Sequence, residues 1–291
     1  MIAEAIPLPV RPAIRPPPPH PAPVLMERAR GVARITIKSD GGETRLVENY
    51  QSGAAKVRFP RIRPGEPLEV VLVNTAGGVT GGDSLSYAIA AEAGAKGTIA
   101  TQAAERVYRR AAGVAEIATS LRVAEGASLE WLPQETIVFD GSALSRTLNA
   151  DVHPAGRLLA VEAIVLGRTA MGERARNVIV ADQWRIRRGG TLVFADGLRF
   201  DGDAEAAMAG PATGNRAAAI ATLVLIAPDA EAKLDAARQA LASCAGEGGV
   251  SAWNGMLVAR LIAPAGQALR AGLMRVIETL RERQLPRVWY C

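Results

Sequence analysis

The residues best suited to do chemistry in this chain are carboxylates that stand in short polar motifs beside glycine or proline. Asp83 closes the motif GGVTGGD, Glu173 closes GRTAMGE, and Glu135 and Asp140 lie in LPQETIVFD. Oxygen ligands of this kind bind divalent metals weakly. Such a set therefore suits an ion that is passed on better than an ion that is held.

Nitrogen and sulfur ligands are scarce. The chain has two histidines, His20 and His153, and two cysteines, Cys244 and Cys291. These four residues are too few for a disulfide framework and make a zinc site of Cys and His ligands improbable. No H-E-x-x-H or G-x-S-x-G motif occurs, and histidine is the usual general base. We therefore predict a protein that is not an enzyme and has no tightly bound cofactor, with free thiols that fit a reducing cytoplasm.

The glycine-rich motif at 77–83 follows an apolar, strand-like run at 68–73 and invites comparison with phosphate-binding loops. No Lys-Ser or Lys-Thr pair follows the glycines, and their spacing is not G-x-G-x-x-G. Residues 84–89 alternate like a strand, so no helix N-terminus is present there to bind an anion. The motif predicts a tight turn that displays Asp83 into a cavity or channel.

Paired carboxylates are the one enzymatic alternative. Glu135 and Asp140 lie ~17 Å apart in an extended chain and point to opposite faces. An all-β hydrolase would need two carboxylates in one open cleft, about 5 to 10 Å apart. The hydrolase hypothesis remains the alternative to a non-catalytic protein.

Other charged residues have simpler interpretations. Arg168 and Glu173 are interpreted as a structural ion pair, and Glu105 and Arg106 as solvated. Glu162 is different, because it stands in the apolar run LAVEAIV. A lone carboxylate in such a run is costly unless it has a partner.

Alternation of apolar and polar residues predicts the elements that carry these motifs. Residues 33–38, 117–123 and 148–152 alternate strictly and are separated by glycine-containing turns, which favours stacked antiparallel sheets over a parallel βαβ fold. Two late helices are predicted, one over 230–243 with Asp229 as N-cap and one over 267–283 with an apolar stripe. The fold class is therefore mainly β, two stacked sheets with two C-terminal α-helices.

Composition sets the remaining limits. Of the 291 residues, 49% are hydrophobic and 22% charged, enough for a sizeable core. With 4% aromatic residues and no basic block, we predict no nucleic-acid partner. The longest apolar stretch, 217–227, is too short to span a membrane. Residues 1–31 form a Pro-rich tail, read as disordered or as a docking arm, and residues 32–291 form one domain.

Six segments, in order, resemble the urease accessory protein family UreD, also called UreH. They are GGVTGGD, TQAAERVYR, LPQETIVFDG, GRTAMGE, WRIRRGGTLVFAD and LPRVW. The resemblance covers residues 32–291. It implies a helix-like winding of the two sheets, binding to the urease apoprotein and to UreF, and contact through UreF with the UreG GTPase. It also implies transient Ni²⁺ transfer through a water-filled tunnel; a pure adaptor without a metal path is the third possibility.

The resemblance and the motifs together give a set of candidate site residues. Asp83 and Glu173 are the candidates for transient metal contact. The tunnel or cavity candidates are Asp83, Thr101, Gln102, Glu135, Asp140, Glu162, Arg168 and Glu173. The partner-binding candidates are Leu285, Arg287 and Trp289, with the helix at 267–283 forming or supporting the UreF surface.

Overall fold

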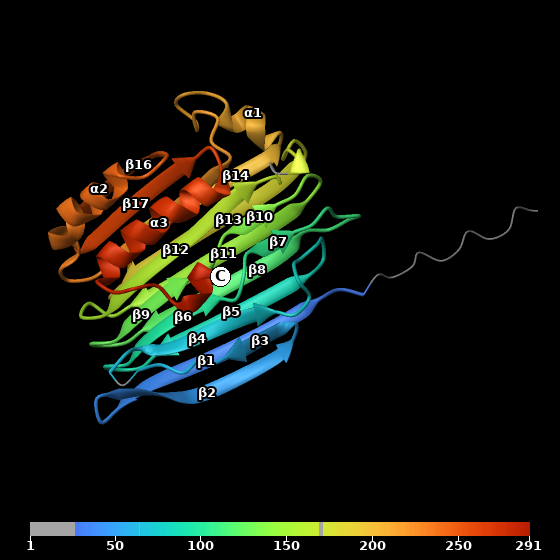
Figure 1. The fold of residues 1–291 in the computed structure, drawn as a ribbon. Coiled ribbons are helices and arrows are strands. Elements are labelled where there is room, and N and C mark those ends of the chain that lie inside the picture. Colours follow the sequence, from blue (N-terminus) through green and yellow to red (C-terminus); the bar gives the residue numbers. More distant parts are fainter. Residues whose placement is uncertain (1–26, 64, 169–170) are drawn as a thin grey trace, which may run out of the picture.

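Two β-sheets lie face to face in the computed structural model, which describes residues 27–63, 65–168 and 171–291 (Figure 1). The Pro-rich segment up to residue 26 lies outside the described residues. The first sheet has seven strands in the order β14 (Thr191–Gly202), β13 (Val178–Arg188), β11 (Ala143–Val152), β8 (Ala115–Val123), β5 (Ser84–Ala91), β1 (Arg30–Asp40) and β2 (Glu43–Gly53).

The second sheet follows the order β16 (Glu247–Trp253), β17 (Met256–Ala263), β15 (Ala219–Ile226), β12 (Arg157–Leu166), β9 (Ser128–Leu132), β6 (Lys96–Thr101), β4 (Leu68–Asn74) and β3 (Ala55–Arg58). Two short strands, β7 (Glu105–Val107) and β10 (Thr136–Val138), run parallel to each other beside it, and β10 pairs with β12.

The direction of pairing differs from the antiparallel sheets predicted from the turns. In the first sheet β1, β5, β8, β11 and β13 are all parallel neighbours, and in the second sheet β4, β6, β9 and β12 are as well. Antiparallel pairs lie toward the outer strands of both sheets. Between β4 and β13 the chain repeatedly passes from one sheet to the other and returns beside the strand that it left, which gives the helix-like winding that the resemblance implied.

Burial along the strands follows from this stacking. In β8 every second residue is buried, because one face meets the second sheet and the other meets solvent. In β12 nearly every residue is buried, because its outer face is covered as well. One hydrophobic core therefore lies between the sheets, and another lies between the second sheet and the helices.

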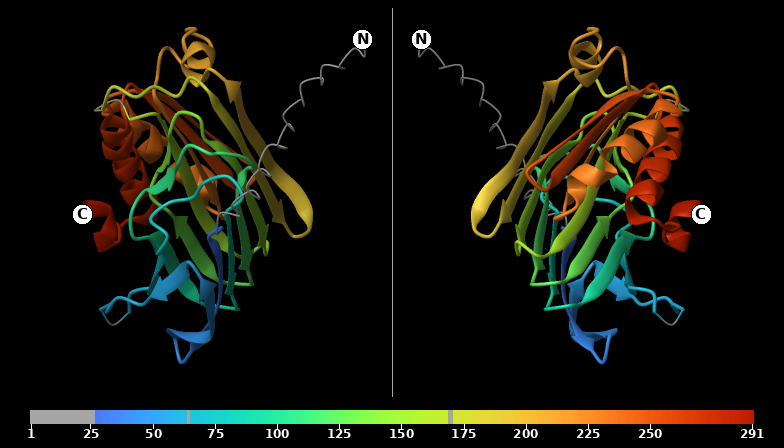
Figure 2. Two further views of the ribbon diagram at one scale, coloured as in Figure 1. Left: turned by 90° about the vertical axis from the view of Figure 1, so that its right-hand side faces the viewer. Right: turned by 90° about the vertical axis from the view of Figure 1, so that its left-hand side faces the viewer.

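The two C-terminal helices cover the outer face of the second sheet, as the views from both sides show (Figure 2). α3 (Gly266–Arg281) buries the predicted stripe of Leu269, Leu273, Val276, Ile277 and Leu280. It ends two residues before its predicted end, because Glu282 adopts a left-handed φ of 56°. None of the helices in the described residues is long and apolar enough to cross a membrane.

The other helix starts later than predicted. Residues Ala230–Lys233 form a 3₁₀ turn, and α2 spans Leu234–Ala242. Asp229 makes no capping bond with its side chain and instead lies 3.8 Å from Arg157. A short helix that the sequence did not suggest, α1 (Ala204–Met208), is capped by Asp203. A final 3₁₀ turn covers Arg287–Tyr290.

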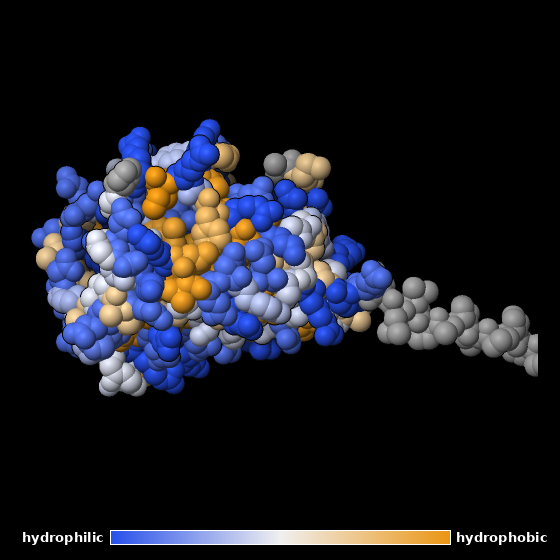
Figure 3. All heavy atoms as spheres, turned by 90° about the horizontal axis from the view of Figure 1, so that it is seen from below, coloured by the Kyte–Doolittle hydropathy of each residue, from blue (hydrophilic) through white to orange (hydrophobic). Residues whose placement is uncertain are grey.

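The edge strand β2 is the least buried strand. It carries exposed Leu46, Val47 and Tyr50, and Val47 bulges out of the pairing with β1. Seen from below, from the side on which β2 lies in Figure 1, the molecule shows a hydrophobic patch among charged residues (Figure 3).

Candidate functional site

Four of the six motifs come together at one end of the wound sheets. They lie in the connections that leave the second sheet and enter the first, at the end where β7 and β10 lie (Figure 1). We call this region the crossing edge and define it as residues 75–83, 102–114, 133–142, 167–168 and 171–177. The winding of the chain thus gathers segments separated by about a hundred residues of sequence.

Main-chain hydrogen bonds join these crossings side by side. The Val79 amide donates to the Arg106 carbonyl at 2.7 Å, and the Tyr108 amide donates to the Val79 carbonyl at 2.8 Å. The Phe139 amide then donates to the Val107 carbonyl at 3.0 Å. Gly78 must be glycine, because a Cβ there would lie 2.3 Å from the Tyr108 ring and its φ is 149°.

Asp83 holds the first of these turns. It is buried, and its two carboxylate oxygens accept from the main-chain amides of Ala29 and Thr80, each at 2.8 Å. The turn that the glycines predict is present, but both oxygens of Asp83 are engaged by backbone donors. Asp83 therefore ties the crossing to the start of β1 rather than offering a free carboxylate.

Asp140 and Glu173 join the later crossings. Asp140 accepts from the main-chain amide of Asn177 at 2.9 Å and lies 3.4 Å from the Arg109 guanidinium. Glu173 accepts from the Asp140 amide at 2.8 Å, and its other oxygen pairs with Arg168. The predicted Arg168–Glu173 ion pair is therefore confirmed. Within the residues that the structure describes, no three His, Cys, Asp or Glu side chains form a group able to hold a metal ion.

The C-terminal motif LPRVW docks onto LPQE. The Trp289 indole donates to the Leu132 carbonyl at 3.1 Å, and the side-chain amide of Gln134 donates to the carbonyls of Gln102 and Val288, both at 2.9 Å. The Thr101 hydroxyl also takes part in this contact, because it accepts from the main-chain amide of Gln134 at 2.9 Å. The sixth motif thus meets the second and third.

Arg270 of α3 stabilises the same junction between LPQE and LPRVW. One of its nitrogens donates to Gln134 and to Glu135, both at 2.9 Å, and the other donates to the Trp289 carbonyl at 2.7 Å. Among the partner-binding candidates, Leu285 and Trp289 are buried in this junction and Arg287 is exposed. The buried pair anchors the tail, so only Arg287 offers its side chain to a partner.

Glu162 has the partner that its apolar surroundings require. Its carboxylate lies 2.5 Å from the Arg146 guanidinium and accepts from the Trp131 indole at 3.0 Å. Arg146 in turn donates to both oxygens of Asp182, at 2.7 and 3.1 Å, and to the Thr136 hydroxyl. This buried cluster lies between the two sheets.

Arg146 and Asp182 are not among the predicted site residues, although the sequence carries a signal for both. Arg146 and Asp182 occupy inward positions in two alternating strands, where their neighbours two residues away are leucine, valine or tryptophan. A charged residue at an inward position must meet an opposite charge. Reading the alternation for its exceptions would have identified both residues.

A cavity of about 200 Å³ opens beside this cluster, lined by Arg146, Glu162, Asp182, Asp196 and Arg260 among others. Burial and the nearby Asp182 raise the pKa of Glu162, and the Arg146 charge opposes this rise. Burial would lower the pKa of Arg146, but the two carboxylates raise it above its usual value. Arg146 is therefore a permanent cation held between two acids.

A second cavity, of about 170 Å³, lies near the crossing edge. Its lining includes Asn74, Tyr87, Thr101, Gln102 and Glu105. Glu105 is not solvated as predicted: burial raises its pKa to about 7, although a hydrogen bond from Asn74 at 3.0 Å opposes the rise.

The buried rings of Tyr87 and Trp131 lie between a wall of the second cavity, to which Tyr87 belongs, and Glu162, which lines the first. Their centroids are 6.2 Å apart, and the Trp131 indole bonds to Glu162. Of the eight tunnel candidates, Glu162 thus lines the 200 Å³ cavity, which we call the inner cavity, and Thr101 and Gln102 line the 170 Å³ cavity, which we call the outer cavity. The other five are held in turns or ion pairs.

Nothing in this arrangement favours the carboxylate-pair hydrolase. The two acids that share the inner cavity and its buried cluster, Glu162 and Asp182, are both bound to the same guanidinium. A glycosidase-type pair needs one protonated acid and one free carboxylate facing the substrate. The buried cluster offers neither.

Comparisons with known proteins agree with the motif pattern. The family model described as UreD urease accessory protein matches residues 29–290. A protein named urease accessory protein UreD from Methylobacterium sp. (strain 4-46) is 46% identical over 278 residues, which are 93% of this chain and 98% of that protein. One of the same name from Xanthobacter autotrophicus is 45% identical over 265 residues, 91% of each chain. The chain therefore belongs to the UreD family of urease accessory proteins, and it is a urease maturation factor rather than an enzyme.

Proposed function

We propose that this protein binds the urease apoprotein and UreF, reaches the UreG GTPase through UreF, and conducts nickel toward the urease active site without a tightly bound cofactor. The observation that carries this proposal is the cavity between the sheets whose lining includes the carboxylates of Glu162, Asp182 and Asp196. The free cysteines Cys244 and Cys291 fit the reducing cytoplasm in which we place this exchange.

In the proposed path, nickel binds transiently in the outer cavity and then in the inner cavity. The outer cavity offers amide, hydroxyl and carboxyl groups of Gln102, Tyr87 and Glu105, and the inner cavity offers Glu162 and Asp182. Such oxygen donors hold a divalent transition metal weakly, so an ion can leave as readily as it enters. A Tyr87–Trp131 pair between the cavities must shift to let the ion through.

Arg146 sets the condition for transfer. Its guanidinium pairs with Glu162 and Asp182, and the third acid of this cavity, Asp196, pairs with Arg260, so an arriving Ni²⁺ meets a positive charge before it meets a free acid. The ion can use Glu162 only when Arg146 turns toward Asp182 alone. The conducting state therefore differs from the present one at Arg146 as well as at the Tyr87–Trp131 pair.

Glu162→Gln tests the metal path. The amide keeps the size of the side chain and can still accept from Trp131, but it removes one carboxylate from the inner cavity. We expect urease co-expressed with this variant and its partners to contain several-fold less nickel, while the accessory complex forms at its normal level. The measurement is the nickel content of purified urease by mass spectrometry.

The matched control is Glu48→Gln, at a half-buried carboxylate on β2 that pairs with Arg34. It should leave urease fully metallated. Full metallation with Glu162→Gln, at normal complex levels, removes Glu162 from the path and favours a pure adaptor.

The UreF surface is proposed on the outward face of α3 and at Arg287. Ala271 is exposed in the middle of that face, and the apolar side of the helix is already used against the sheet. Ala271→Glu should reduce recovery of UreF in a pull-down by about tenfold, because a charge at the centre of an interface is left without water.

Ala118→Glu provides the control, since Ala118 is exposed on β8, on the outer face of the opposite sheet. It should recover UreF normally. Equal recovery with both variants would place UreF elsewhere on the molecule.

A further inference from the structure

A basic groove lies beside the C-terminal end of α3. It is formed by residues 61–63 and 66–69 on one side and by residues 281–287 on the other, and its volume is about 590 Å³. The charged residues that line it are Arg61, Arg63, Glu66, Arg281, Arg283 and Arg287, together with Glu69. The groove is separate from both cavities described above.

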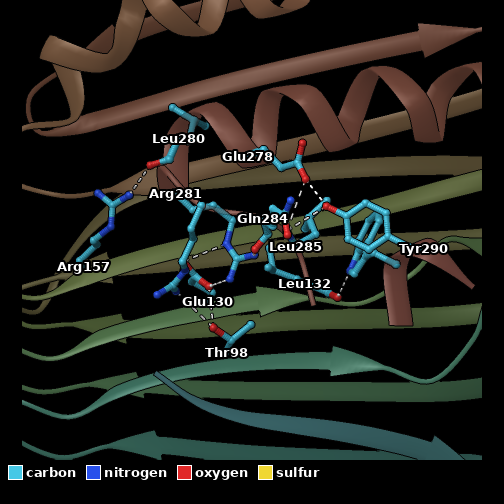
Figure 4. Close-up of polar contacts among 12 residues, drawn as sticks. Thr98, Glu130, Leu132, Arg157, Glu278, Leu280, Arg281, Gln284, Leu285 and Tyr290 are labelled. Carbon is cyan, nitrogen blue, oxygen red and sulfur yellow. Dashed lines mark hydrogen bonds and ion pairs between the residues drawn. The ribbon is translucent and has the colours of Figure 1, made fainter. Parts of the chain in front are cut away.

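The base of the groove carries more positive than negative charge, because two arginines share one glutamate. Glu130 is buried and pairs with Arg281 at 2.8 Å and with Arg283 at 2.7 Å, and Figure 4 shows Glu130 beneath Arg281 beside Thr98. Burial alone would raise the pKa of Glu130, but the two arginines bring it below its usual value. One carboxylate therefore serves two guanidiniums.

A second feature of the base points to a missing acceptor. The Arg283 Nε is buried and has no hydrogen-bond partner among the described residues. Buried donors are almost always satisfied, and an exception calls for a bound water, ion or ligand. The unpaired donor lies in a residue that lines the groove.

The rim adds three arginines. Arg61, Arg63 and Arg287 are exposed, and none of them forms an ion pair within the part of the chain that the structure describes. The Glu66 carboxylate accepts from the Arg63 main-chain amide at 3.1 Å. Five arginines against Glu66, Glu69 and Glu130 leave a formal charge of 5 − 3 = +2.

We propose that this groove binds an extended acidic segment of a partner protein, with at least two carboxylate side chains. Guanidinium groups present paired donors that match carboxylates. The walls also contain Ile62, Pro67 and Leu285, which give the methylene groups of a peptide an apolar surface that a bare anion would not use. A volume of this size holds ligands well above the size of a single phosphate.

This inference goes beyond nickel transfer and does not depend on it. It shares only Arg287 with the proposed UreF surface, so the test changes Arg61 and Arg63 instead. Loss of peptide binding with intact UreF recovery, or the reverse, therefore separates the two proposals.

The test uses the full chain and a fluorescein-labelled hexaglutamate peptide, with binding followed by fluorescence anisotropy. Arg61→Ala with Arg63→Ala should weaken binding about tenfold, and binding should fall with added salt. The control pair is Arg122→Ala with Arg187→Ala, two exposed arginines on the outer face of the first sheet, which should bind as the unchanged chain does.

Three results would overturn the proposal. The first is equal affinity for hexaglutamate and hexaglutamine, and the second is equal binding by the two double variants. The third is displacement by equimolar inorganic phosphate, or tighter binding of a single-stranded oligonucleotide, either of which would make the groove a general anion site.

Discussion

Replacement of Arg146 by methionine should lower the free energy of unfolding by about 3–5 kcal/mol. The substitution leaves Glu162 and Asp182 buried without the guanidinium that pairs with both of them. Methionine fills much of the same volume, so the loss reports the uncompensated charges rather than a cavity. Urea denaturation followed by tryptophan fluorescence measures the effect.

The pH dependence of this variant has a defined sign. Burial raises the pKa of Glu162 above its unfolded value, and removal of Arg146 deletes the charge that opposes the rise. A carboxyl group with a raised folded-state pKa stabilises the protein below its unfolded pKa, and that stabilisation is lost as the pH rises through the folded value. The deficit of Arg146→Met should thus be smaller at about pH 4.5 than at about pH 8.

Arg122→Met is the matched control, because Arg122 is exposed on β8. It should change the free energy of unfolding by less than about 0.5 kcal/mol. A similar small change with Arg146→Met would contradict the role given to the buried cluster.

Trp289→Ala should also cost about 3–5 kcal/mol of unfolding free energy. The indole is 2% exposed, packs against the core beneath α3, and donates to the Leu132 carbonyl. Its ring also lies 5.0 Å from the Arg270 guanidinium. Thermal unfolding by circular dichroism, with denaturant titration for the magnitude, measures the loss.

Two further substitutions separate packing from the hydrogen bond. Trp253→Ala removes an indole that is 44% exposed and should have an effect of about 0.5 kcal/mol. Trp289→Phe keeps most of the ring but loses the donor, so it should fall between the two alanine variants. A loss at Trp289 no larger than that at Trp253 would show that the tail is not anchored by this residue.

The strands were largely predictable from the sequence, and the direction of their pairing was not. Residues 117–123 alternate because one face of β8 is buried, and alternation reports that face whatever the neighbouring strand does. Glycine turns are compatible with a hairpin and with a crossing to another sheet. The strands β5, β8 and β11 are parallel because the chain crosses to the second sheet after each of them and returns beside the strand that it left.

The candidate site was predicted in its motifs but not in the roles of its acids. The crossings bring the motifs together. The carboxylates of Asp83 and Asp140, however, accept hydrogen bonds from main-chain amides that would be paired with carbonyls if they lay in a strand. Glycine-rich crossings leave such amides unpaired, and a nearby carboxylate is their natural acceptor. A local motif does not reveal which amides need an acceptor.

The exposed edge of β2 has a consequence for the chain before it meets its partners. An outer strand presents unpaired main-chain donors and acceptors, and β2 adds Leu46 and Val47 to them. Two copies can pair strand to strand there, so we expect the isolated protein to self-associate at high concentration. The bulge at Val47 interrupts the straight ladder, which limits the pairing to the part of β2 on one side of it.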